Sequence, residues 1–205
     1  MTIECSVVPV TPYQQNCSIM KCATTGKAAI VDPGGEAERI LGTVEAMGAQ
    51  VEKILLTHAH VDHCAAADVL RQRLEVPIEG PHVDDGFWLE KLPEWCRMSG
   101  MPPVEPFMPD RWLVDGDTVT VGEIVLRVIH CPGHTPGHMA VSISSGGERL
   151  LYIGDTVLHP LHLEHPDWLP IYDIVPEQAG SSKQRIFDLA AEEGSAAAEL
   201  ATIEA

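Results

Sequence analysis

The segment "THAHVDH" at 57–63 places three histidines and an aspartate within six positions, directly after the apolar run "ILL". His58, His60, Asp62 and His63 offer the nitrogen and oxygen ligands that zinc, iron and manganese accept. If the chain leaves a strand here as a loop, the first two histidines point to one side, while the aspartate and the third histidine turn into a helix start. This spacing predicts that one segment serves two neighbouring metal ions; the alternative is a set of solvated histidines at a strand end.

Further ligands are expected where other apolar strands end. His134 lies in "HCPGHTPGH", where glycines and prolines force a tight loop after the strand "VLRVI". Asp155 follows the apolar run "LLYIG". A carboxylate buried there needs a counter-charge, and a pair of metal ions would supply it. The sequence therefore predicts that His134 and Asp155 join the first cluster.

These motifs resemble the pattern of the metallo-β-lactamase superfamily, which is HxHxDH, a histidine in a later glycine-rich loop, an aspartate after a strand, and a final histidine. Over residues 1–138, the stretches "VTPYQQNC", "VDPGG", "ILLTHAHVDH", "DRWLVDGD" and "VIHCPGHTPGH" are similar to the glyoxalase II type, the hydroxyacylglutathione hydrolases. Residues 139–194, with "TVLHPLHLEHPDWLPIYDIVP", look more like the lactonase and organophosphate-hydrolase-like branch.

The resemblance implies a two-metal hydrolase with a defined ligand set. The implied ligands are His58, His60 and His134 for the first metal, Asp62 and His63 for the second, and Asp155 as a bridge. The expected cofactor is zinc, as one or two ions, with iron or manganese as alternatives. A shared metal-bound hydroxide would attack the substrate, because bound water loses its proton near neutral pH, and Asp62 would orient it as the catalytic residue.

The two halves of the sequence favour different small-molecule substrates. The first 138 residues favour hydrolysis of a thioester of the hydroxyacylglutathione kind. The segment after Asp155 favours a lactone or another ester, because that segment normally covers the substrate. Anionic glutathione derivatives would need nearby cations, yet the only basic residues after Asp155 are Lys183 and Arg185.

The final histidine of the superfamily pattern has no counterpart in the sequence. Both branches would place it beyond the helix that ends near Gly194, but no histidine follows His165. A metal-binding domain with impaired or no catalysis is therefore the rival interpretation. The remaining histidines are expected in other roles. His159, His162 and His165 are expected in a loop or lid, and His82 at a surface helix start. His130 and His138 are expected to contact the ligands or to have a structural role.

Hydrophobic periodicity predicts the elements that must position these residues. Strands are expected over 4–10, 16–21, 28–32, 51–57 and 76–80, helices over 36–48 and 63–75, with Asp62 as cap of the latter, and one helix near 83–92 before a proline-rich loop. Two hairpins follow over 115–134 and 139–155, then a loop over the site and a helix that begins near Pro176. The pattern indicates an α/β (α+β) fold, an αββα sandwich with a shortened C-terminal half, built as one domain over 1–194 with a weakly structured tail over 195–205.

Composition limits the partners and the location. The 13 basic and 30 acidic residues give a net charge of −17, which disfavours binding to nucleic acid and to anionic membranes. The sequence shows no secretion signal and no long apolar stretch, so a soluble cytoplasmic protein with six reduced cysteines is expected. A shortened second half would leave a sheet edge unpaired, which favours a homodimer.

Overall fold

The first half of the chain forms a five-stranded sheet in the order β1-β2-β3-β4-β5. The computed structural model describes residues 2–193 and 196–198. The strands are β1 (Ile3–Val10), β2 (Gln15–Cys22), β3 (Lys27–Val31), β4 (Gln50–Leu55) and β5 (Ile78–Glu79). The first three pair antiparallel, as the predicted meander, whereas β4 runs parallel to β3 because α1 (Ala37–Ala46) makes the crossover.

The second half forms another five-stranded sheet, in the order β10-β9-β8-β7-β6. Its strands are β6 (Thr118–Val121), β7 (Ile124–His130), β8 (Met139–Ser145), β9 (Glu148–Tyr152) and β10 (Ala196–Ala198). The two predicted hairpins are present, and their turns use Gly122 and Gly147 at positive φ, which glycine adopts without strain.

The expected weak tail begins with a strand. Residues 196–198 pair parallel to β9, so this edge of β9 is paired over those positions, whereas an unpaired sheet edge was expected in the second half. This strand was not predicted, because alanine has low intrinsic strand preference. The other residues of the tail, 195 and 199–205, lie outside the described residues.

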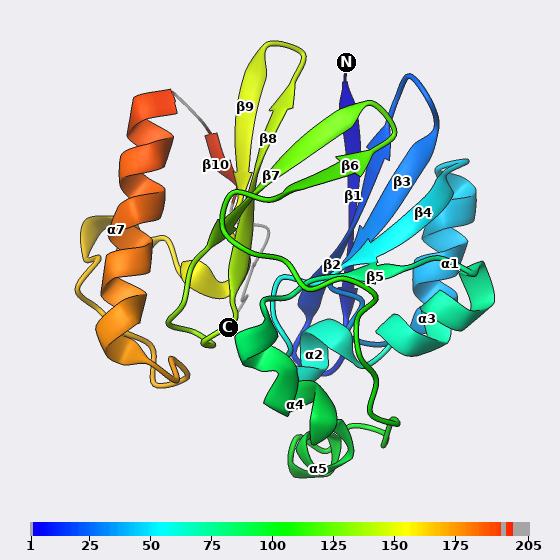
Figure 1. The fold of residues 1–205 in the computed structure, drawn as a ribbon, viewed down its shortest axis with the longest axis horizontal. Coiled ribbons are helices and arrows are strands. Elements are labelled where there is room, and N and C mark those ends of the chain that lie inside the picture. The colour runs from blue at the N-terminus through cyan, green and yellow to red at the C-terminus, as the bar shows by residue number, and fades with distance from the viewer. Residues whose placement is uncertain (1, 194–195, 199–205) are drawn as a thin grey trace.

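The two sheets pack face to face, with helices on the outer faces (Figure 1). The layer between them is apolar and includes Met20, Val31, Leu55, Leu126 and Val141. In Figure 1, α1 and α3 (Ala67–Leu74) lie beside the first sheet, and α7 (Pro176–Glu193) lies beside the second. The predicted αββα sandwich is therefore confirmed, and α7 begins at the predicted proline.

The helix after the histidine motif differs from the prediction. It is divided into α2 (Val61–Cys64) and α3, and Asp62 lies inside α2 instead of capping it. His60, in an extended conformation, occupies the capping position and makes no side-chain capping bond. The early helix start turns Asp62 and His63 together toward the neighbouring strand ends.

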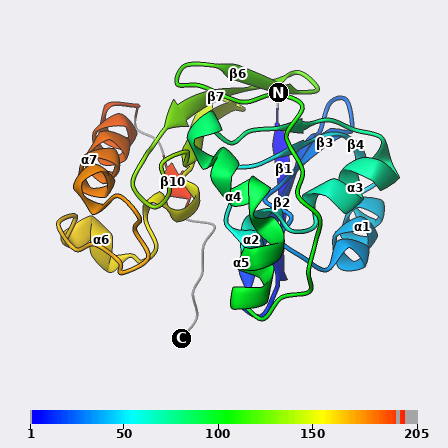
Figure 2. The same ribbon diagram turned by 60° about the horizontal axis from the view of Figure 1, so that its bottom comes forward.

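The region 83–98 contains more helix than predicted. The structure has η1 (Val83–Asp85), α4 (Gly86–Glu90) and α5 (Leu92–Met98), where a single helix near 83–92 was expected. The second helix starts with Pro93 in its first turn and buries Leu92 and Cys96, an i, i+4 pair. Figure 2 brings α2, α4 and α5 forward together.

The chain after β9 is mostly irregular, as expected for a segment near the site. It contains η2 (Gly154–Thr156) and the short helix α6 (Leu161–Glu164) before α7. Within the described residues, no helix combines the length and the apolar character that crossing a membrane requires.

Candidate metal centre

The three predicted strand ends meet at one place. Asp155, after β9, lies at the centre: its Oδ2 atom is 3.2 Å from His134 Nε2, 3.6 Å from His63 Nε2 and 4.0 Å from His58 Nε2. His60 Nδ1 lies 3.0 Å from His134 Nε2. Asp62 Oδ2 lies 3.8 Å from His63 Nε2. All six predicted residues therefore come together, with His58, His63 and His134 buried.

His58 presents a free lone pair to this cluster. The Thr57 hydroxyl donates to Asp32 Oδ2 at 2.6 Å, so its oxygen accepts from His58 Nδ1 at 3.0 Å. His58 Nε2 is then an acceptor, and it is buried without a hydrogen-bond partner. Because buried polar atoms are normally paired, an orphaned acceptor beside Asp155 fits a site for a cation.

Asp32 orients His63 in the same way. It lies at 3.1 Å from His63 Nδ1 and also accepts from the Thr57 amide at 2.7 Å. An ionised carboxylate only accepts, so His63 Nδ1 donates to Asp32, and its Nε2 atom faces Asp62 and Asp155. Asp32 had no predicted role, although it shows the same signal as Asp155, a carboxylate directly after an apolar strand.

Asp85 ties together the two loops that carry the histidines. It is fully buried and accepts from the Ala59 amide at 3.0 Å, the Thr135 hydroxyl at 2.7 Å and the Gly137 amide at 2.6 Å. Ala59 separates His58 from His60, so one carboxylate holds both loops in register. The sequence placed Asp85 only in a helix, because its partners are distant along the chain.

Burial and the mutual attraction of opposite charges set the protonation states in the cluster. Burial lowers the pKa of His58 and of His60 well below the usual value, so both rings are neutral, as metal ligands must be. Burial opposes the charged forms of Asp155 and His63, but their mutual attraction prevails: the pKa of Asp155 falls well below, and that of His63 rises well above, its usual value. Burial raises the pKa of Asp62.

The other histidines lie outside the converging set. His138 Nε2 accepts from the Asp155 amide at 3.0 Å, and burial lowers the pKa of His138 to about 3, so it supports the backbone of Asp155. His82 and His130 stack with ring centroids 4.3 Å apart and an interplanar angle of 21°. Asp84 lies near both rings, so these three residues could in principle hold an ion. A histidine nitrogen binds a metal in the plane of its ring, and because the two rings are stacked, one ion cannot lie in both planes. His82, Asp84 and His130 therefore form a poor metal site.

The three histidines of the predicted loop or lid are separate from the cluster. His162 is buried on α6, and His165 stacks on Trp168 with an interplanar angle of 10°. None of them lines the cavity that opens on Asp155.

That cavity has a volume of about 610 Å³ and a largely apolar wall. Its apolar and aromatic lining consists of Tyr13, Val61, Trp88, Trp95, Met98, Tyr152, Leu158 and Tyr172. Trp88 stands edge-on to His60, with ring centroids 4.8 Å apart, and contacts Trp95. Among the described residues that line it, the charged groups are acidic or histidine, and lysine and arginine are absent.

Comparison with known proteins establishes the family. Residues 10–204 match the model of the metallo-beta-lactamase superfamily, and the chain belongs to this superfamily. The hydroxyacylglutathione hydrolase GloC of Haemophilus influenzae is 39% identical over 158 residues, which is 77% of this chain and 72% of that protein. The probable metallo-hydrolase YqgX of Bacillus subtilis is 31% identical and aligns over 73% of this chain and 69% of its own. The chain is thus a metal-dependent hydrolase of glyoxalase II-like sequence.

Solved structures give the same architecture. TTHA1623 in a di-iron-bound form superposes with a TM-score of 0.74 and 28% identity, over 90% of this chain and 86% of its own. The hydrolase AbOPH superposes with a TM-score of 0.63 and 22% identity, over 90% of this chain and 70% of its own, which shows a shared fold.

Some sequence relatives are longer than this chain. The hydroxyacylglutathione hydrolase of Rhodospirillum rubrum is 32% identical, and this chain spans 46% of its length.

Proposed function

We propose that this hydrolase cleaves small-molecule thioesters at the cluster around Asp155. The observation that carries the proposal is the convergence of three histidine Nε2 atoms on the buried carboxylate of Asp155, with the Nε2 atom of His58 left without a hydrogen-bond partner. The proposed ligands are His58, His60 and His134 for one ion, Asp62 and His63 for the other, and Asp155 between them.

Nitrogen and oxygen donors of this kind suit zinc, with iron or manganese as alternatives, and a similar fold carries two irons. When bound, the ions would acidify a water molecule and polarise the acyl carbonyl. Asp62 lines the cavity, with its side chain 24% exposed, and would accept a hydrogen bond from the attacking water. Thr57, Asp32 and Asp85 would keep the imidazoles and their loops in place.

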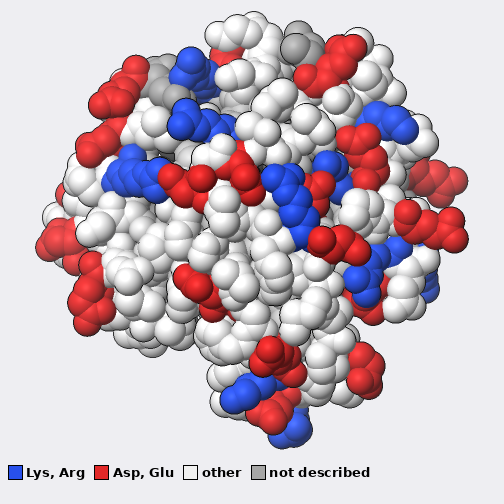
Figure 3. Space-filling view, viewed as in Figure 1, with Lys and Arg blue, Asp and Glu red and all other residues white. Residues whose placement is uncertain are grey.

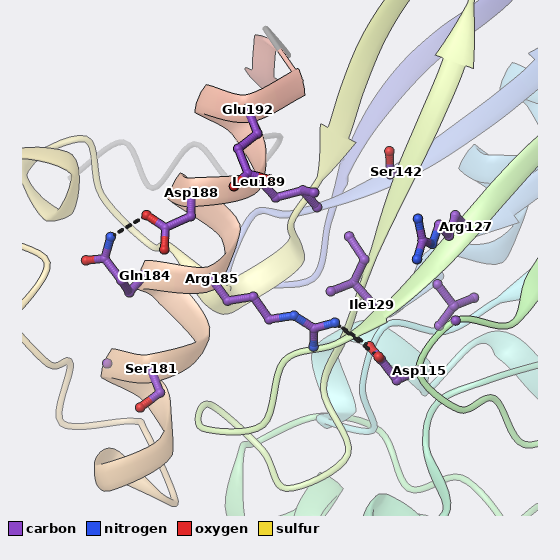
Figure 4. A pocket seen from close by; sticks show the side chains of 13 residues that line it. Asp115, Arg127, Ile129, Ser142, Ser181, Gln184, Arg185, Asp188, Leu189 and Glu192 are labelled. Atoms are coloured by element: carbon purple, nitrogen blue, oxygen red, sulfur yellow. Dashed lines mark hydrogen bonds and ion pairs between the residues drawn. The ribbon is translucent and has the colours of Figure 1, made fainter.

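The relatives named hydroxyacylglutathione hydrolases support a thioester substrate. The cavity favours the neutral members of that class. Lys183 donates to the Trp168 carbonyl at 2.9 Å, and Arg185 is paired with Asp115 at 2.9 and 3.0 Å. In Figure 4, Arg185 extends from α7 toward Asp115 across a different pocket. Neither cation lines the cavity, so the carboxylates of a glutathione moiety would gain no ion pair from them.

An ester or lactone is the second candidate substrate. The specific observation that favours it is the same aromatic wall without lysine or arginine, which suits an uncharged acyl or alkoxy group. The visible face in Figure 3 also mixes acidic and basic side chains without one continuous basic patch, in keeping with a small-molecule substrate and not nucleic acid.

Parallel turnover measurements test these assignments. We expect the metal-loaded protein to cleave an S-acyl N-acetylcysteamine, which is uncharged, at a higher kcat/KM than S-lactoylglutathione. An acyl-lactone and a p-nitrophenyl ester test the second candidate. Absence of thioester cleavage in a fully metallated sample would refute the first. A protein that binds one ion per chain and turns over none of the four compounds would instead support the rival, a domain with impaired catalysis.

A further inference from the structure

A buried ion pair lies behind His134. The Asp173 Oδ1 atom is 3.4 Å from His134 Nδ1, the ring nitrogen that does not face Asp155. Lys183 Nζ lies 3.9 Å from Asp173 Oδ2, and the two side chains are only 1% and 2% exposed. Asp173 comes from the irregular segment before α7, and Lys183 from within α7. Burying two charged side chains is costly, so their position beside a candidate ligand suggests that they act on that ligand.

The chemistry of the pair fixes which nitrogen of His134 carries a proton. An ionised carboxylate only accepts hydrogen bonds, so His134 Nδ1 donates to Asp173. His134 Nε2 then keeps its lone pair, and this is the atom that faces His60 and Asp155. The arrangement repeats the contact between Asp32 and His63 on the other side of the cluster.

Lys183 accounts for the charge of Asp173. A buried charge needs an opposite charge or hydrogen bonds beside it, because its removal from water is costly. The ammonium group supplies the opposite charge, while the Trp168 carbonyl accepts one of its hydrogens at 2.9 Å. Asp173 Oδ2 has no hydrogen-bond partner, so the ion pair with Lys183 is its main compensation.

The backbone around Asp173 is held firmly against the loop of His134. The Ile174 amide donates to the His134 carbonyl at 3.2 Å, and the Val175 amide donates to the Gly133 carbonyl at 2.8 Å. The Ser182 hydroxyl donates to the Pro132 carbonyl at 2.6 Å. These bonds place the start of α7 and the loop at 132–134 in a fixed relation, so Asp173 is aimed at the ring by contacts other than its own.

We propose that Asp173, neutralised by Lys183, is a positioning residue that sets the tautomer and direction of His134 for metal binding. The inference rests on the proposed role of His134 as a ligand. It assigns to the segment after Asp155 a second task besides covering the cavity: it orients a candidate ligand, as Thr57 and Asp32 in the first half of the chain orient His58 and His63.

Zinc affinity of the chelator-stripped full chain tests this, measured by competition with a chromophoric chelator. We expect Asp173→Ala to bind zinc about 10- to 100-fold more weakly than the parent, the usual cost of losing such a partner. Asp173→Asn should lie between them, because its amide oxygen still accepts but carries no charge. Asp167→Ala, an exposed site in the same segment, is the matched control and should bind as the parent does.

A proton spectrum of the zinc-loaded protein gives a second readout that general destabilisation would not move. The parent should show a downfield His134 Nδ1–H resonance, assigned with His134→Gln, and Asp173→Ala should lose it. The inference would be overturned, with the ligand set intact, if Asp173→Ala bound zinc within two-fold of the parent and retained the resonance. If Asp173→Ala does not fold, the same result for Asp173→Asn would overturn it. If the parent binds no zinc, or His134→Gln binds it equally well, the proposed ligand set fails and this inference with it.

Discussion

Asp85→Ala should weaken the fold more than its distance from any substrate suggests. The change removes an acceptor that three donors share: the amides of Ala59 and Gly137 and the Thr135 hydroxyl. The hydroxyl can rotate toward another acceptor, but the two amides cannot. Leaving a buried donor unpaired costs about 1–3 kcal/mol, so with two amides unpaired we expect a loss of about 2–6 kcal/mol in the free energy of unfolding.

The assay is chemical unfolding of the metal-free protein, followed by tryptophan fluorescence. The neighbouring variant Asp84→Ala is the matched control, because Asp84 is exposed and its 3.2 Å contact with His82 is worth at most about 1 kcal/mol. Asp85→Ala should also bind zinc more weakly, since Ala59 lies between two candidate ligands. A loss of stability below about 1 kcal/mol, or one equal to that of the control, would refute the role given to Asp85.

Three further outcomes are expected. The metal-free protein should lose stability as the pH falls below about 6.5, by about 1.4 kcal/mol per pH unit for each buried histidine that protonates only on unfolding. His138 is such a histidine, because burial lowers its pKa to about 3. Urea titrations between pH 7.5 and 5 measure this, and a flat stability profile would contradict it. Gly34→Ala should abolish soluble folded protein, because a Cβ atom there would lie 1.4 Å from the Asp62 carbonyl oxygen. The control Gly42→Ala, in α1, should raise stability by about 0.5–1 kcal/mol in the same unfolding assay, because its Cβ atom would meet nothing within 4 Å. A saturating excess of zinc, about 1,000 times its dissociation constant, should raise stability by about 4 kcal/mol, and an unchanged denaturation midpoint would argue against metal binding to the native state.

Much of the fold and of the candidate ligand set could be predicted because the signals are local. The alternation in "TVTVGEIVLRVI" indicates a hairpin whichever strands lie beside it. The ligand candidates follow apolar strands, and strands that end on the same side of a sandwich bring such residues together. The helix at Leu92–Met98 was missed because the prolines within and after it suggested a loop, although Pro93 falls where a helix tolerates it.

The supporting residues could not be predicted in the same way. Asp85 meets partners 26, 50 and 52 positions away, and Asp173 meets His134 across 39 positions. No local pattern encodes such pairs, because each depends on how separate loops pack. Lys183 was noticed only as a candidate partner for a substrate anion, and its burial against Asp173 reverses that interpretation.

The zinc stoichiometry of the stripped and reconstituted full chain, compared with that of His58→Ala, decides whether the cluster around Asp155 is a metal centre. His58 is the residue whose buried Nε2 atom has no partner other than the proposed ion. We predict at least one tightly held ion per parent chain, and a clear loss of bound zinc in a variant that still folds. A parent chain that retains no metal after dialysis, or a variant that binds as much as the parent, would contradict the proposal that this cluster is a metal centre.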